Sequence, residues 1–93
     1  MEEGTRIIIT VVGFDRVGII AGIANILAAA NANILDISQT ILQGFFTMVM
    51  VADIGKMSIE LGELTQSLKS VGRELGLDIN VQHEDIFRFM HRI

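Results

Sequence analysis

The chain has 93 residues, which is enough for one domain. It contains no cysteine, and this excludes disulfides, thiolate metal sites, iron–sulfur clusters and cysteine nucleophiles. A formal net charge of −4 argues against binding to a nucleic-acid backbone, which calls for a basic patch. We therefore expect a single domain over residues 1–93, with a core over 6–83 and a helical tail over 84–93.

The apolar content is high for so short a chain. Apolar residues make up 51% of the sequence and charged residues only 19%, and thirty residues are Ile, Leu or Val. A domain of this size buries only about 60–65% of its unfolded surface when it folds alone. We therefore expect a homo-oligomer, most simply a dimer, that hides apolar surface between copies.

Membrane insertion and secretion are both disfavoured. Residues 17–35 carry no charge, but three asparagines interrupt them, and the unbroken apolar stretches are too short for a bilayer core of about 20 apolar residues. Glu2 and Glu3 stand where a secretory signal would be positively charged. The prediction is a soluble, cytoplasmic protein without a membrane partner.

The first predicted strand covers Arg6–Val12, is apolar on both alternating faces, and should be central in its sheet. Gly13 is expected to end it. Asp15 is expected to cap a following helix by accepting the amide protons of Val17 or Gly18. The apolar stripe of that helix is Ile19, Ile23, Ile26 and Ala30.

Asn31 and Asn33 are expected to stop the helix and turn the chain. Residues 34–42 alternate as a strand, with Leu35, Ile37, Gln39 and Ile41 on its drier face and Ile34, Asp36, Ser38 and Thr40 on its wetter one. Gln43-Gly44 signals a hairpin turn. The return strand, Phe45–Ile54, is apolar on both faces and should also be central.

A second helix is predicted after Ser58, a plausible cap, and Gly76 should end it in the left-handed conformation. Leu77–His83 alternates as an edge strand would. The helix stripe is Leu61, Leu64, Leu68, Val71 and Leu75; in the tail, Ile86, Phe87, Met90 and Ile93 are expected to point inward and to pack on the domain, on a second copy, or on another protein.

The element order is therefore β-α-β-β-α-β. Right-handed crossovers favour an α+β, ferredoxin-like sandwich: a four-stranded antiparallel sheet of order 4-1-3-2 with two helices on one face, plus the short C-terminal helix. The two strands expected to be central are those that this topology places in the middle. The face of the sheet away from the helices would remain apolar and uncovered, and such a patch normally indicates a partner.

No catalytic or metal-binding set stands out, so we expect no enzyme, no metal and no cofactor. His83 and His91 are more typical of surface or interface positions than of a metal site with Glu84. RNA-binding relatives of this fold carry aromatics on the central strands. Here Phe45 and Phe46 point to opposite faces and the first strand is expected to have no aromatic, which argues against nucleic acid as a partner.

The loop between the first strand and the first helix is the best candidate site. Gly18 allows close approach to the backbone, and a helix N-terminus offers free amide donors to an anionic group. Asp15 can accept an ammonium group, and Asn33 offers both a donor and an acceptor. These groups suit an α-amino acid, although glycine and aspartate can equally serve only to shape the turn.

Residues Val12-Gly13-x-Asp15-Arg16-x-Gly18-Ile19-x-Ala21-x-Ile23, with Asn33-Ile34 opening the second strand, resemble the ACT domain over roughly residues 6–83. Residues 36–40, Phe46-Thr47-Met48 and the tail are similar to its single-domain UPF0237 branch, which is related to the ACT repeats of the glycine-cleavage-system transcriptional repressor. The resemblance implies a small-molecule sensor.

It also implies ligand contacts at the surface where two domains pair. Carried over by position, the ligand-binding residues are Asp15, Arg16, Val17, Gly18, Ile19, Asn33 and Ile34, the last two from the same copy or from the neighbouring one. Many ACT domains have proline where this chain has Val17, so its loop is less restricted in φ.

Three functions follow in order of preference. The first is a non-catalytic, homodimeric regulatory module that binds an amino acid or similar metabolite and is read by a partner protein. The second is an adaptor that pairs proteins without a ligand. The third is an enzyme, for which acyl-phosphate hydrolysis with Arg16 is the remaining chemistry.

Overall fold

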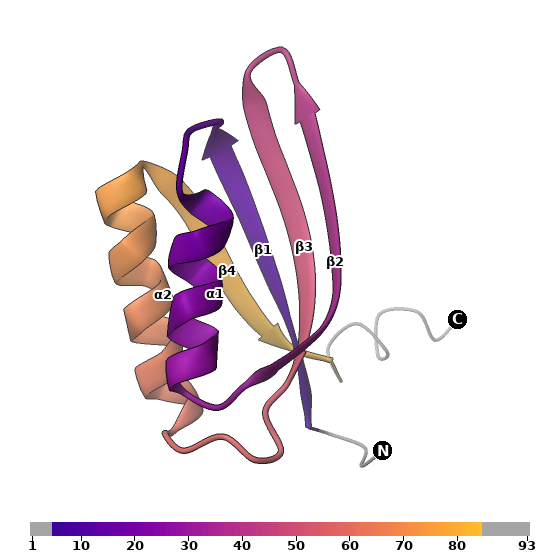
Figure 1. Ribbon diagram of the computed structural model, residues 1–93, viewed down its shortest axis with the longest axis vertical. Helices are drawn as coiled ribbons and strands as arrows, with labels where there is room; N and C mark the ends of the chain where they lie inside the picture. The colour runs from indigo at the N-terminus through magenta and orange to yellow at the C-terminus, as the bar shows by residue number, and fades with distance from the viewer. Residues whose placement is uncertain (1–4, 85–93) are drawn as a thin grey trace.

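The computed structural model describes residues 5–84, and the predicted tail helix lies outside them except for Glu84. Six elements follow one another along the chain (Figure 1). They are β1 (Arg6–Phe14), α1 (Ile19–Ala29), β2 (Asn33–Leu42), β3 (Phe45–Asp53), α2 (Leu61–Leu75) and β4 (Leu77–His83). The predicted β-α-β-β-α-β order is confirmed.

The four strands form one antiparallel sheet in the order β2-β3-β1-β4. This is the predicted ferredoxin-like topology, with β1 and β3 in the centre and β2 and β4 at the edges. Both helices cover the same face of the sheet, as Figure 1 shows. The opposite face of the sheet is left without a covering element among residues 5–84.

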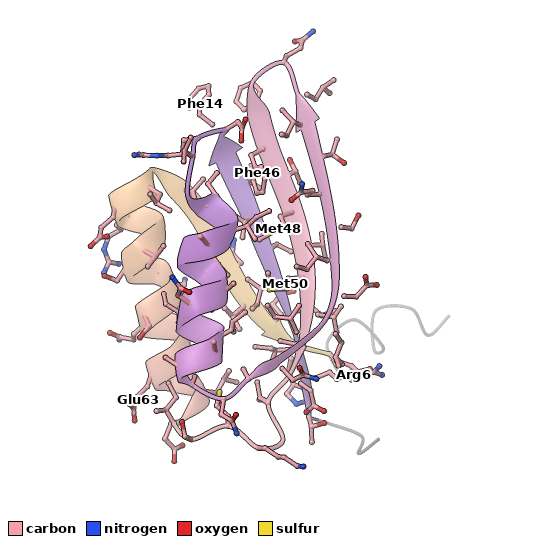
Figure 2. All side chains as sticks on the ribbon, in the orientation of Figure 1. Arg6, Phe14, Phe46, Met48, Met50 and Glu63 are labelled. Atoms are coloured by element: carbon pink, nitrogen blue, oxygen red, sulfur yellow. The ribbon has the colours of Figure 1, made fainter. Side chains whose placement is uncertain are left out.

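The core lies between the helices and the inner face of the sheet. Alternate residues of β1 and β3 point into it, and Figure 2 shows Phe46, Met48 and Met50 in line along β3. The helices contribute the predicted stripes, with Leu27 buried as well. Fully buried side chains are Ile7, Ile9, Val11, Ile23, Leu27, Met48, Met50, Leu64 and Leu68.

The turns follow the local chemistry of the sequence. Gln43 and Gly44 both have positive φ, 52° and 84°, as a two-residue hairpin turn requires. Asn31, at φ 61°, ends α1 in the left-handed region that asparagine tolerates. Gly76, at φ 70°, caps α2 as predicted, and its amide donates to the carbonyl of Gly72.

Several expected details differ. Ser58 does not cap α2, because the N-cap is Glu60; instead the hydroxyl of Ser58 donates to the carbonyl of Ala30 at the end of α1 (3.2 Å). A register shift between Ile34 and Asp36 places Ile34 on the helix side of the sheet, opposite to the predicted alternation.

The face of β2 that was predicted to be drier is exposed to solvent in a single copy. Ile37 is 40% exposed and Ile41 is 54% exposed, although both share the inner face of the sheet with Met50 and Phe46. The reason is that α2 packs along β4, at the opposite edge of the sheet, and α1 makes few contacts with β2. The β2 edge therefore presents both apolar side chains and an unpaired strand.

The sequence was predicted to contain no membrane-spanning segment. Neither helix within residues 5–84 has the length and apolar character needed to cross a bilayer.

Candidate functional site

The loop between β1 and α1 lies at the hairpin end of the sheet. The amide of Asp15 donates to the carbonyl of Gly44 (2.8 Å), which holds the start of the loop against the β2–β3 turn. Gly18 then reverses the chain with φ 94°, and the amide of Gly22 donates to its carbonyl (2.9 Å) as α1 begins. A left-handed residue at this position requires glycine, so the path of the loop is encoded locally.

The predicted cap of α1 is wrong. Gly18 is the N-cap, no side-chain hydrogen bond caps the helix, and no acidic residue lies in its first turn. The helix begins at Ile19 rather than directly after Asp15, so the carboxylate lies three residues before the cap. The first-turn amides consequently have no intrahelical acceptor and no capping side chain, and the positive end of the helix dipole faces the loop.

The side chains of the loop divide into two groups. Asp15, Arg16 and Val17 are exposed, and Val17 is 96% exposed, which is extreme for a valine. The side chain of Ile19 is only 2% exposed and belongs to the core. Of the predicted site residues in this loop, Ile19 can therefore offer a ligand only its backbone amide.

Asn33 and Ile34 lie at the other end of the sheet. Asn33 pairs with Asp53, next to Arg6, whereas Leu42 at the far end of β2 pairs with Phe45, next to Phe14. Figure 2 shows Arg6 and Phe14 at opposite ends of β1. Nine residue steps along β2 span roughly 30 Å.

One copy therefore does not bring the two groups of predicted site residues together. A second copy can do so if its β2 runs antiparallel to the first β2. Asn33 of the second copy then lies beside Leu42, at the end of the sheet that carries the loop. Of the two alternatives left open by the sequence, only the neighbouring copy is compatible with a single site.

Sequence reasoning missed an aromatic pair beside this loop. β1 does not end at Gly13 but continues to Phe14, so the first strand does carry an aromatic residue. The ring of Phe14 stacks on that of Phe45, with centroids 5.0 Å apart and planes at 23°, on the face away from the helices. The sequence pattern could have predicted this pair, because Phe14 follows Val12 by two residues and therefore points to the same face of the strand.

Metal-binding chemistry has no counterpart in this region. Within residues 5–84 there is no group of three His, Cys, Asp or Glu side chains that could hold a metal ion. The ionic contact of β1 is structural: the guanidinium of Arg6 donates through Nε to Oε2 of Glu84 (2.7 Å) and also pairs with Oε1. This pair joins the start of β1 to the end of β4.

A β-α-β-β-α-β sandwich with a glycine-bent first loop is a ferredoxin-like domain, and the comparison with known families identifies the branch of that fold to which the chain belongs. The ACT domain model matches residues 5–82. A UPF0237 protein of Methanosarcina mazei is 54% identical over 89 residues, covering 96% of this chain and 97% of the relative. A UPF0237 protein of Clostridium perfringens is 52% identical, covering 92% and 97%.

The chain therefore belongs to the ACT domain family, in its single-domain UPF0237 branch. Among solved structures, an ACT domain protein from Streptococcus pneumoniae superposes with a TM-score of 0.77 at 38% identity, covering 91% of this chain and 96% of that one. A putative glycine cleavage system transcriptional repressor has the same fold (TM-score 0.73, 21% identity) over 88% of this chain and 47% of that one. ACT domains are typically regulatory modules that bind small molecules.

Proposed function

We propose that this protein is a non-catalytic regulatory module that binds an amino acid or a similar small metabolite at the N-terminal end of α1. The observation that carries the proposal is the exposed and uncapped start of that helix, reached through the left-handed Gly18. Free first-turn amides suit a carboxylate. The exposed Asp15 beside them suits an ammonium group, so the pair of charges on an α-amino acid has a counterpart for each.

A second copy would complete the site along the β2 edge. Its Asn33 supplies an amide that can both donate and accept, and Ile41 of the first copy, which lies level with Gly13, supplies apolar surface at the same end of the sheet. The first loop of one copy and the strand start of the other then share one ligand. Structural neighbours described as a transcriptional repressor and as a regulatory subunit of aspartate kinase support a regulatory role.

A thermal-shift screen of the standard amino acids tests the ligand. We expect at least one of them to raise the melting temperature, because a ligand that binds only the folded state stabilises it by mass action. Asp15→Ala should reduce that rise while leaving the ligand-free melting temperature nearly unchanged, since Asp15 is exposed and caps nothing.

Glu60→Ala is the matched control. It removes an exposed carboxylate at the start of α2 that makes no side-chain cap, at the end of the molecule away from the loop. A flat response of the unmodified protein to every amino acid would contradict ligand binding of this class. An equal loss of response in both variants would show that Asp15 acts only through net charge.

A ligand-free adaptor is the second candidate, favoured by the uncovered apolar face of the sheet. It would bind a protein with the same affinity whether or not the amino acids are present. Measuring that affinity for a captured partner with and without the best stabilising amino acid separates the two functions, because only the sensor requires a difference.

A further inference from the structure

The face of the sheet away from the helices, which we call the open face, has the composition of an interface. Its two central strands carry six apolar side chains and two threonines; the apolar ones are Ile8, Val12, Phe14, Phe45, Val49 and Val51. Its two edge strands carry mainly Ser, Thr, Asn, Gln and Asp. An apolar centre inside a polar rim is the usual anatomy of a protein–protein contact.

Four of these six apolar side chains are exposed in a single copy, and Ile8 and Val51 are half-buried. Val12, Phe14, Phe45 and Val49 are between 41% and 68% exposed. Monomeric proteins seldom leave so continuous an apolar patch in water. Four strands spaced about 4.8 Å apart and nine residues long cover roughly 600 Å², close to the share of one partner in the smaller stable interfaces of about 1,200 Å² in total.

We propose that the open face is covered by the open face of a second copy, about a two-fold axis that runs parallel to the strands. The side chains differ from one end of the face to the other. Leu42, Phe45 and Phe14 form one row at the hairpin end, whereas Asp53 and Arg6 form the row at the opposite end. An axis across the strands would place the charged row on the apolar row.

An axis along the strands keeps each row on its counterpart and exchanges β1 with β3. Phe14 then faces Phe45 of the second copy, and Ile8 faces Val51. Arg6, whose guanidinium pairs with Glu84 in its own copy, faces Asp53, so unlike charges lie opposite one another at the rim. Asp36 and Asp78 meet neutral groups, because Asp36 lies opposite Gln82 and Asp78 opposite Thr40 in this arrangement. Like charges do not oppose one another, so the face is complementary to itself.

This contact is distinct from the β2 pairing of the proposed function and does not depend on it. It uses the outer face rather than the edge, and its axis lies in the plane of the sheet rather than perpendicular to it. The two axes do not meet, so a copy that used both contacts would build an open chain instead of a closed dimer. We therefore expect the ligand-free protein to be a face-to-face dimer.

Sedimentation of Val49→Lys tests the contact. Val49 lies on β3 near the centre of the face, and a lysine there is tolerated by a single copy because the position is exposed. In the dimer it would bury two ammonium groups, which should raise the dissociation constant about a hundredfold or more. Gln66→Lys, an exposed position on α2, adds the same charge away from the face and should leave the dimer intact.

A folded Val49→Lys protein that remains dimeric would overturn the proposal, as would an unmodified protein that is monomeric at high concentration. Circular dichroism and thermal melting report whether each variant is folded. If Val49→Lys does not fold, cross-linking supplies the answer in its place.

Cross-linking uses the absence of native cysteine. Val49→Cys should be joined to its counterpart in the second copy by a short bismaleimide, because both residues lie beside the proposed axis. Ser38→Cys, in the middle of the β2 edge strand, should not be joined without ligand. Efficient joining through Ser38→Cys and none through Val49→Cys would show that the copies pair along β2 and would refute face pairing while supporting the dimer of the proposed function.

Discussion

Replacing Gly18 by alanine tests whether the loop at the start of α1 is encoded by backbone geometry alone. Gly18 has φ 94°, and a Cβ built there meets no atom within 4 Å. The substitution therefore introduces no steric contact with other residues, and its cost is the backbone strain of an L-residue in the left-handed region. That strain is about 1–2 kcal/mol.

For a domain of this size, such a loss lowers the melting temperature by roughly 5–15 °C. Chemical denaturation in urea, at one fixed protein concentration, measures the free energy of unfolding directly. Gly44→Ala, at φ 84° in the hairpin and also without a contact within 4 Å, should cost about as much. Both glycines are exposed, so burial does not distinguish them.

Gly62→Ala is a control that should change the free energy of unfolding in the opposite direction. Gly62 lies in α2 with ordinary φ and open space around it, so alanine should stabilise the helix by about 0.5–1 kcal/mol. Gly18→Ala with unchanged or increased stability would refute the assignment of a left-handed residue at the helix start. The amino-acid response should also fall in Gly18→Ala, because the first-turn amides move with the loop.

Other substitutions should have the following effects. Leu68→Ala, at a fully buried position of α2, should lower the free energy of unfolding by about 2–5 kcal/mol in urea titration. Gly72→Ala should destabilise despite the better helix propensity of alanine, because its Cβ would lie 2.9 Å from the carbonyl oxygen of Leu77, and overpacking costs about 1–3 kcal/mol. Asp15→Ala and Asn33→Ala should each lose the amino-acid response, whereas an equimolar mixture after subunit exchange should recover about one quarter of the sites. No recovery in the mixture would mean that the two residues do not share a site across copies.

The helices and strands could be predicted because the spacing of the apolar residues and the residue types at the turns indicated the same boundaries. The double-sided apolar character of β1 and β3 predicted central strands, and Gln43-Gly44 and Gly76 carried the turn and the helix stop at the observed positions. The predictions that failed concerned individual side-chain contacts, which depend on how the elements pack in three dimensions. Ser58 has the right chemistry for a cap, but the end of α1 packs close enough for its carbonyl to accept the hydroxyl instead.

The candidate site was only partly predictable, for a geometric reason. Glycine and aspartate next to a helix start indicated the loop, and the loop is where the helix amides are free. Sequence spacing could not show that Asn33 lies a full strand length away from the loop between β1 and α1, because that distance follows from the register of β2 on β3. It also could not show that the helices leave the β2 edge uncovered, since this depends on where they lie across the sheet.

The two uncovered surfaces lead to a coupled equilibrium. A ligand held by the loop of one copy and Asn33 of another stabilises β2 pairing and has no direct contact with the open face. Since the two contacts use different surfaces, a copy can make both at once, and ligand would add β2 pairing to the face pairs and extend them into open chains. Adding the best stabilising amino acid should therefore raise cross-linking through Ser38→Cys, leave it unchanged through Val49→Cys, and produce species larger than a dimer in sedimentation. Reciprocity requires that ligand affinity increase with protein concentration when free copies are present. An affinity independent of concentration, together with unchanged cross-linking at both positions, would show that each copy binds its ligand alone.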